Sequence, residues 1–295
     1  MSAFPRPALL LATCMVALGP GCSAVTPRQG DAALVRSLVP ADAVALEMLT
    51  LRVPADAAAL DESLWIGIDE LQFPTELRRR LAANGIRAGV IGARLPASLE
   101  QLLKSDGPSG ASTDANPAIQ VSDFENEPRV RRRIIETRSG RKMKFVCIGE
   151  KERVGELSLL LRCDDGAVNG RTYRKVMGLL LARAFPEGDG RVRLEVLPEI
   201  EHGDPQRRFE PGDGMMRVEF GPARERFDTL RLEAVLSPGQ TLLLTCVADR
   251  PGTLGHHFFT ENASDRVVQK LVLVRLAAAN YDDLFSPDTP AAEID

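Results

Sequence analysis

The first third of the chain mixes two kinds of hydrophobic spacing, which predicts a small α/β unit over residues 41–104. The apolar run 43–53 lies between two prolines, and its length and composition predict a strand. Leucine and isoleucine recur at helical spacing over residues 57–71, which predicts a helix. This unit also contains two more predicted helices, at 74–83 and 95–103, and a predicted strand between them at 86–92.

In the longer second part of the chain the hydrophobic spacing changes to a period of two, which is typical of strands with one buried face. Residues 192–200 show it best, because apolar and charged side chains alternate there. Ser139–Gly140 predicts a hairpin between the first two strands, and residues 237–240 predict a tight turn between two later ones. The fold class is therefore α+β, in which the small α/β N-terminal unit precedes a predominantly antiparallel β domain over residues 118–278. Its predicted strands are 130–137, 142–148, 157–163, 177–185, 192–200, 215–220, 226–236, 241–248 and 267–277.

Polar segments flank these two units. Residues 105–117 contain no apolar side chain larger than Ala, so they cannot bury enough surface to offset ordering, which predicts a flexible loop. Residues 22–40 are polar and interrupted by prolines, which predicts a tether. Residues 279–295 carry five carboxylates and two prolines, which predicts an acidic disordered tail.

The first 21 residues have the pattern of a signal peptide for export. One positive charge precedes a short apolar core, and small residues follow it before a break. The core is too short to span a bilayer, which needs about 20 apolar residues. Two processing sites are open: Cys22 becomes the lipidated first residue of a lipoprotein, or cleavage follows Ala24. The chain is expected to be exported to the bacterial cell envelope, where a lipid on Cys22 would anchor it to a membrane, facing the periplasm.

Composition and charge exclude several classes of function. The 295 residues are 44% hydrophobic and 26% charged, which is ordinary for a globular protein. The formal net charge of −4 gives no global basic field, so nucleic acid is not expected as a partner. No second long apolar segment follows the signal, so no transmembrane helix is predicted.

Three cysteines remain after the signal and Cys22, and each lies in an apolar, strand-like run. They are Cys147, Cys163 and Cys246, and an odd number cannot pair completely. Cys147 and Cys163 could face each other across neighbouring strands, or all three are small buried thiols. Their spacing matches no zinc motif.

No residue is assigned a catalytic, cofactor-binding or metal-binding role, because no motif in the sequence matches one. His202, His256 and His257 with Glu261 come nearest to a metal site. Adjacent histidines on a strand point to opposite faces, which disfavours a shared metal. The pair Phe258–Phe259 is either an exposed aromatic tip for a membrane or partner, or one ring faces the core.

Basic side chains crowd the hairpin predicted over residues 130–148. They form either a patch for lipid headgroups, acidic polymers or the acidic residues just before it, or a solvated strand face. The acidic residues are Asp123, Glu125 and Glu127. The basic residues are Arg129, Arg131, Arg132, Arg133, Arg138, Arg141, Lys142 and Lys144.

The order of features in the β region resembles the core domain of bacterial secretins, the outer-membrane rings of secretion and pilus machines. Four segments carry the resemblance: a strand–turn–strand over 130–149, a glycine–proline hairpin over 178–199, a Gly-Gln-Thr strand pair over 236–244 and a final strand over 270–276. Residues 44–53 fit the strand that usually leads into this core. Pro238 stands where the secretin pattern has Asp. The matching positions include Thr137, Gly140, Val146, Gly149, Gly178, Leu181, Pro186, Gly190, Val192, Leu194, Pro198 and Glu199.

The chain also departs from the secretin pattern. The final strand lacks the closing Thr-Pro, and residues 248–259 keep only fragments of the stretch that shapes the membrane-facing lip. Only the unit at 41–104 stands where secretins have several ring-building modules. The resemblance therefore implies a secretin-like β domain without implying a pore.

These observations predict a non-enzymatic, lipid-anchored envelope protein that acts in envelope assembly or protein secretion. Its expected partners are the membrane, through the lipid, and either further copies of itself or secretion components. The alternative is a monomeric ligand-binding β module, sandwich-like in architecture. A hydrolase of envelope polymers is a third interpretation.

Overall fold

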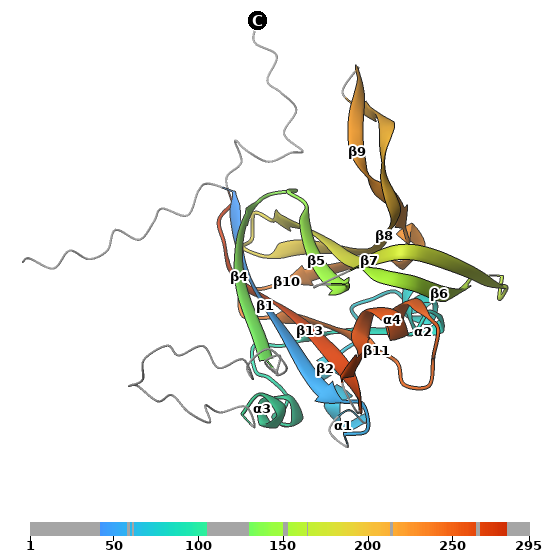
Figure 1. Ribbon diagram of the computed structural model, residues 1–295. Coiled ribbons are helices and arrows are strands. Elements are labelled where there is room, and N and C mark those ends of the chain that lie inside the picture. Colours follow the sequence, from blue (N-terminus) through green and yellow to red (C-terminus); the bar gives the residue numbers. More distant parts are fainter. Residues whose placement is uncertain are drawn as a thin grey trace, which may run out of the picture. The chain divides into compact units, whose positions relative to one another are not determined.

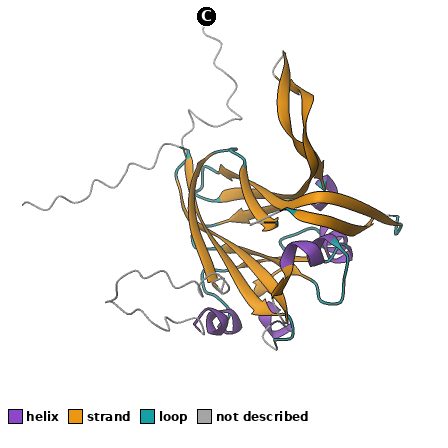
Figure 2. Ribbon diagram, viewed as in Figure 1, coloured by secondary structure: helices purple, strands orange, loops and turns teal. Residues whose placement is uncertain are grey.

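Two antiparallel β-sheets make up most of the structure, with short helices at their margins (Figures 1 and 2). This arrangement confirms the predicted β-rich α+β class. The computed structural model describes residues 42–57, 60, 62–104, 130–149, 153–163, 165–212, 215–263 and 266–281. All of these residues lie in one compact unit, so the described parts of the segments 41–104 and 118–278 belong together rather than to separate bodies.

Sheet A has seven strands, in the order β2-β3-β11-β13-β1-β4, and β12 also pairs with β13. Strands from the N-terminal segment lie inside it, because β1 pairs with both β13 and β4, and β3 pairs with β11. Long-range strand pairing therefore joins the two predicted units across the loop between them. The strands are β1 (Ala43–Pro54), β2 (Ile68–Asp69), β3 (Ile86–Ile91), β4 (Val130–Arg138), β11 (Thr241–Cys246), β12 (Thr260–Ala263) and β13 (Arg266–Ala279).

Sheet B has six strands, in the order β10-β8-β7-β5, with β6 on β7 and β9 on β8. Strand β7 is longer than the predicted 177–185, because its first half pairs with β6 and its second half with β5 and β8. Strands β7 and β8 separate beyond the pair Met177–Glu201, and β8 continues with β9 as a projecting two-stranded arm (Figure 1). The strands are β5 (Met143–Ile148), β6 (Val154–Arg162), β7 (Val168–Pro186), β8 (Val192–Gly212), β9 (Met215–Arg226) and β10 (Leu232–Leu236).

Two predicted hairpin turns connect one sheet to the other. The turn at Ser139–Gly140 joins β4 of sheet A to β5 of sheet B, so the predicted hairpin over 130–148 is wrong. Residues 237–240 join β10 of sheet B to β11 of sheet A in the same way. A turn motif determines where the chain reverses, whereas pairing depends on which strand offers a matching partner. For β4 that partner is β1, along nine residue pairs.

The helices are short and end where glycine or a capping residue allows it. Helix α2 starts after Pro74 and ends at Ala83, with Asn84 as its C-cap, and Gly85 follows with φ of +76°, as the sequence predicts. The predicted helix over 57–71 is wrong in extent, because Gly67 adopts φ of +88° and ends it. The helices are α1 (Glu62–Trp65), α2 (Thr75–Ala83), α3 (Ala97–Lys104), α4 (Leu254–Phe259) and the 3₁₀ helix η3 (Asp228–Leu230).

Side-chain alternation in sheet A separates two hydrophobic cores. In β1, Val44 and Leu46 face the core between the two sheets. Leu51 and Val53 belong to a second core, which α1 and α3 cover. All four side chains are fully buried, and each contributes about 1.5–3 kcal/mol by leaving water. Sheet A is thus buried on both faces over much of its area, which explains why residues 43–53 lack a strict polar alternation.

Candidate functional site

A cleft of about 1310 Å³ lies between sheet A and strands β5 and β6, and it is the best candidate for a functional site. Sheet A contributes residues of β1, β4, β12 and β13 to it, and α4 contributes two histidines. Strands β4 and β5 both border the cleft, and each is the last strand on its sheet's main path. The cleft therefore opens where the chain passes from one sheet to the other.

The sheet A wall of the cleft carries a strip of basic and polar side chains. Arg131 and Arg133 are two residues apart on β4, so they point to the same face. The strand register sets Arg133 beside Met48 and Arg131 beside Thr50. Two residues after Thr50 on β1, Arg52 lies beside Lys270 of β13. Four cationic side chains therefore line one wall.

The opposite wall is largely apolar. Phe145 and Cys147 of β5 and Leu157 of β6 are buried side chains that line the cleft and belong to the core between the sheets. Val146 of β5 also lines it and is 37% exposed. A ligand in the cleft would therefore meet hydrophobic surface on one side and guanidinium groups on the other.

Positive charge exceeds negative charge among the lining residues that the structure describes. Five are Lys or Arg and two, Glu156 and Glu261, are acidic, a difference of three. Glu261 accepts a hydrogen bond of 2.9 Å from Arg52, and its other oxygen lies 3.9 Å from the Lys270 nitrogen. Lys270 also donates a 2.6 Å hydrogen bond to the carbonyl of Cys147, which ties the two walls together. The positive charge left over makes the cleft attractive to an anion.

Both cleft histidines lie on helix α4, between the strands that the sequence predicts over 241–248 and 267–277. Burial lowers the pKa of His256, and the neighbouring His257 lowers it further. Burial also lowers the pKa of His257, although its contacts with the carbonyls of Ser158 and Gly252 oppose that shift. His257 Nε2 lies 2.9 Å from the Ser158 carbonyl, so it engages backbone rather than the serine hydroxyl. The lowered pKa values favour the neutral form of both rings.

The histidines do not converge on a common point. His202 lies on β8, against the ring of Tyr173 at 5.0 Å between centroids. Within the described ranges, no three His, Cys, Asp or Glu side chains are placed to hold a metal ion. Helix α4 also buries Phe258 and Phe259 completely, so the exposed aromatic tip is wrong. Both rings are buried because residues 254–259 form a helix, in which two adjacent side chains can pack against the same core.

The three cysteines that the structure describes are free thiols. Cys147 and Cys246 are buried and Cys163 is exposed, and none forms a disulfide. The pairing of Cys147 with Cys163 is therefore wrong, and the interpretation as buried thiols holds for two of the three. Burial raises the pKa of Cys246 to about 11, so this thiol stays protonated.

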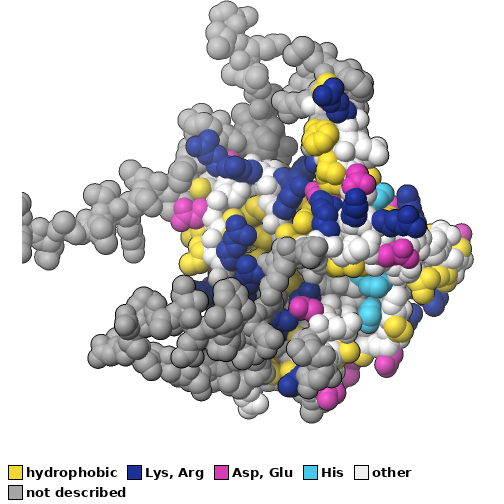
Figure 3. Space-filling view, in the orientation of Figure 1, with side chains coloured by type: hydrophobic (Ala, Val, Ile, Leu, Met, Phe, Trp, Pro, Cys, Tyr) yellow, Lys and Arg dark blue, Asp and Glu magenta, His cyan; other side chains and the backbone are white. Residues whose placement is uncertain are grey.

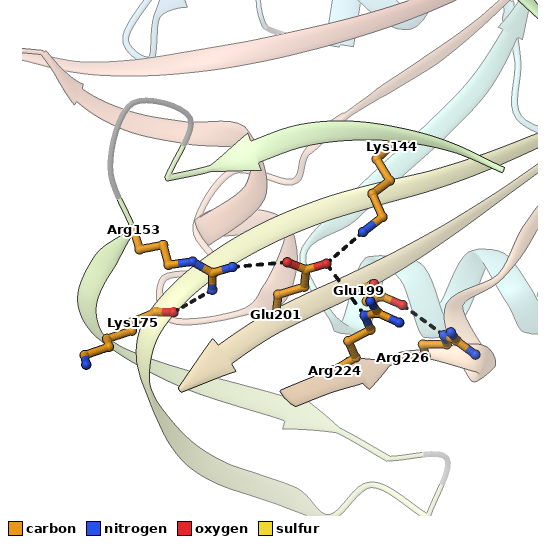
Figure 4. Close-up of polar contacts among 7 residues, drawn as sticks. All are labelled: Lys144, Arg153, Lys175, Glu199, Glu201, Arg224 and Arg226. Atoms are coloured by element: carbon orange, nitrogen blue, oxygen red, sulfur yellow. Dashed lines mark hydrogen bonds and ion pairs between the residues drawn. The ribbon is translucent and has the colours of Figure 1, made fainter. Parts of the chain in front are cut away.

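Beside the cleft, the outer face of sheet B holds a network of buried acids and surrounding bases (Figure 4). Glu201 of β8 accepts hydrogen bonds from Lys144 at 2.9 Å and from Arg153 at 3.2 Å. Glu199, two residues earlier on the same face, accepts one from Arg226 at 2.9 Å. Sequence reasoning missed this network. Its signal in the sequence is the placement of Glu195, Glu199 and Glu201 at alternating positions, between the apolar side chains of residues 192–200.

The structure divides the basic residues of 129–144 between the two sheets. Arg131 and Arg133 line the cleft, whereas Arg132 points the other way and contacts Glu47 at 2.6 Å. Lys142 lines a small cavity on sheet B. Figure 3 shows basic side chains gathered on the upper part of the visible face, with hydrophobic side chains between them. Arg129, the acidic residues 123–127, Cys22 and the predicted signal lie outside the described residues.

Comparison with known proteins gives little help. No family model matches the chain, and no curated protein matches it. Among solved structures, the chain is similar to "InvG secretin domain beta-barrel from Salmonella SPI-1 injectisome NC-base" at 12% identity and a TM-score of 0.23. The match covers 86% of this chain and 66% of that chain. The resemblance to secretins is thus weak and assigns no function. In the described ranges no helix has the length and apolar character needed to cross a membrane.

Proposed function

We propose that the protein is a non-enzymatic binding module whose cleft takes an amphipathic anion, a molecule with one anionic group and a hydrophobic chain. The observation that carries this proposal is the composition of the two cleft walls. The basic strip on β1, β4 and β13 faces the apolar side chains of β5 and β6, and the cleft between them has a volume of about 1310 Å³. The strip would bind the anionic group, and the apolar wall would cover the chain.

The size of the cleft supports a ligand as large as a long-chain amphiphile. Sites for drug-sized molecules have volumes of about 300–1,000 Å³, so this cleft has room for a long acyl chain. Burying each CH₂ group of such a chain contributes about 0.8 kcal/mol. The guanidinium groups would orient the anionic end of the ligand, because Arg binds carboxylate and phosphate oxygens in a bidentate manner.

A titration with a fluorescent long-chain fatty acid tests this proposal. We expect saturable binding that weakens about tenfold or more in the double variant Arg131→Gln, Arg133→Gln. The matched control is Arg132→Gln, on the same strand but facing away from the cleft, and it should bind like the wild type. Equal loss in both variants, or no saturable binding at all, would contradict the proposal.

Export and anchoring complete the proposed function. The apolar core within residues 1–21 and the Gly21–Cys22 step support secretion and lipidation of Cys22. An anchored module in the cell envelope would meet amphipathic anions at the membrane surface. In the Cys22→Ala variant, the protein should move from the membrane fraction to the soluble fraction. Normal processing and continued membrane attachment would show that Cys22 is not lipidated.

Self-assembly is a second candidate, and the β8–β9 arm favours it. Isolated two-stranded ribbons are marginally stable in water and gain stability by pairing or packing. Val218 and Phe220 on β9 are 56% and 70% exposed. Several copies could cover these side chains by packing their arms together, as an assembly role in the envelope would require.

A further inference from the structure

A second cavity, separate from the cleft, lies on the outer face of sheet B. Its volume is about 80 Å³, a space of a few water molecules, since each occupies about 30 Å³ in the liquid. Four cationic and two acidic side chains line it, together with Leu181 and Leu197. The charged lining residues are Lys142, Arg183, Glu195, Arg226, Asp228 and Arg231.

The carboxylates in and next to this cavity already form ion pairs with arginines. One oxygen of Glu195 accepts a 2.6 Å hydrogen bond from Arg193, and its other oxygen lies 3.9 Å from Arg231. Asp228 accepts from Arg231 at 2.6 Å. Glu199, next to the cavity, accepts from Arg226 at 2.9 Å.

Two cations remain after these pairs are formed. Arg183 lies directly opposite Glu195 in the β7–β8 register, but both Glu195 oxygens are engaged elsewhere. Within the described part of the chain, no hydrogen bond or ion pair links Lys142 or Arg183 to a carboxylate. Counting Arg193 and Glu199 with the lining, five cations face three anions, a surplus of two.

The electrostatics of Lys142 agree with that surplus. Burial lowers its pKa, and the positive charges of Arg226 and Arg183 lower it further, against the opposing charge of Glu199. A group held among like charges in this way gains from any anion that enters the site.

We propose that this cavity is a binding site for a phosphate group, held by Lys142 and Arg183 and bordered by Arg226 and Arg231. A phosphate monoester carries a charge of about −1.5 to −2 near pH 7, which matches the surplus of two. Its oxygens suit bidentate donation from guanidinium groups. Free phosphate esters and the headgroups of anionic lipids both present this chemistry.

The first experiment is calorimetric titration of the full-length protein with inorganic phosphate at pH 7.5. We expect saturable binding that weakens about tenfold or more in the double variant Lys142→Gln, Arg183→Gln. The control is Arg174→Gln, also on β7, because Arg174 is 82% exposed and lies away from the cavity. No saturable binding, or the same loss in Arg174→Gln, would overturn the proposal.

Vesicle sedimentation distinguishes the two sources of phosphate. Phosphatidylcholine vesicles with and without phosphatidic acid are compared for the wild type and the double variant. Binding that needs both phosphatidic acid and the two side chains identifies a lipid phosphate. Binding of inorganic phosphate without vesicle binding identifies a soluble phosphate ester, and both results support the site.

Thermal unfolding of the wild type keeps the proposal testable if the variants fold poorly. A ligand that binds only the native state raises the melting temperature. Phosphate at low millimolar concentration, where its general exclusion from the protein surface has little effect, should therefore raise the melting temperature in a saturable way, and chloride at the same ionic strength should not. Equal effects of the two salts would show screening rather than a site and would overturn the proposal.

Discussion

Glu201 is a buried carboxylate that depends on basic side chains from three separate segments. Its side chain is 9% exposed, and Lys144 of β5, Arg153 before β6 and Arg224 of β9 surround it. Burial alone would raise its pKa, but the hydrogen bond and charge of Lys144 and the charges of Arg224 and Arg153 lower it overall. Glu201 therefore connects β5, β8 and β9 through its ionised form.

This arrangement predicts a pH-dependent loss of stability. The folded-state pKa of Glu201 lies below its ordinary value of 4.5, so its contribution is complete at pH values above 4.5. The contribution is lost as pH falls below 4.5 through the folded-state pKa. We expect Glu201→Gln to lower the free energy of unfolding by about 1–3 kcal/mol at pH 7, because hydrogen bonds to a charged group are removed. Urea unfolding measures this loss.

The difference in the free energy of unfolding between Glu201→Gln and the wild type should shrink as the pH falls below 4. The control is Glu76→Gln, which removes an exposed helix pair with Arg79 and should change stability by less than about 1 kcal/mol. A gap that is the same at pH 7 and pH 3.5 would show that the neutral packing of this side chain, and not its charge, matters.

At the scale of elements, α4 and the turn after α2 fit against each other through two glycines. A Cβ built on Gly255 would lie 1.9 Å from the Gly85 carbonyl oxygen, which is backbone and cannot rotate away. The Gly255 amide also donates a 2.9 Å hydrogen bond to the carbonyl of Asn84. This close approach positions α4, and with it the two histidines of the cleft.

Gly255→Ala should therefore destabilise the protein more than an ordinary glycine substitution. Overpacking costs about 1–3 kcal/mol and sometimes more, and here backbone has to move. The control is Gly92→Ala, because a Cβ there meets nothing within 4 Å and its φ is not positive. Chemical denaturation of both variants measures the difference. Equal stabilities would show that α4 shifts freely away from α2.

At the scale of the whole molecule, the two proposed functions predict different masses. A binding module should elute as one or two protomers in mild detergent, measured by size-exclusion chromatography with light scattering. A mass many times that of the protomer would contradict the module and support assembly. In that case Phe220→Ser, on the exposed arm, should lower the mass, because it removes apolar surface available for packing.

Much of the element pattern follows from the sequence alone. The period of two predicted most strands after residue 130, since a half-buried strand needs alternating side chains whatever its partner. Proline and the Asn84–Gly85 step predicted the bounds of α2, because capping is local chemistry. Local signals were misleading in two places. Over 57–71 the hydrophobic spacing predicted one helix, but Gly67 ends that helix early. Over 254–259 no helix was predicted, although a short one forms there.

The candidate sites depend on contacts that no local pattern contains. The cleft brings together β1, β4, β5 and β13, and Arg133 meets Met48 only because β4 pairs with β1 instead of β5. The phosphate site likewise depends on which arginine each carboxylate selects. The sequence by itself determined strand-forming periodicity, helix ends, the N-terminal signal pattern and the excess of basic residues at 129–144. Only the tertiary structure decided which strands pair and which charges remain uncompensated, because both depend on residues far apart in the chain.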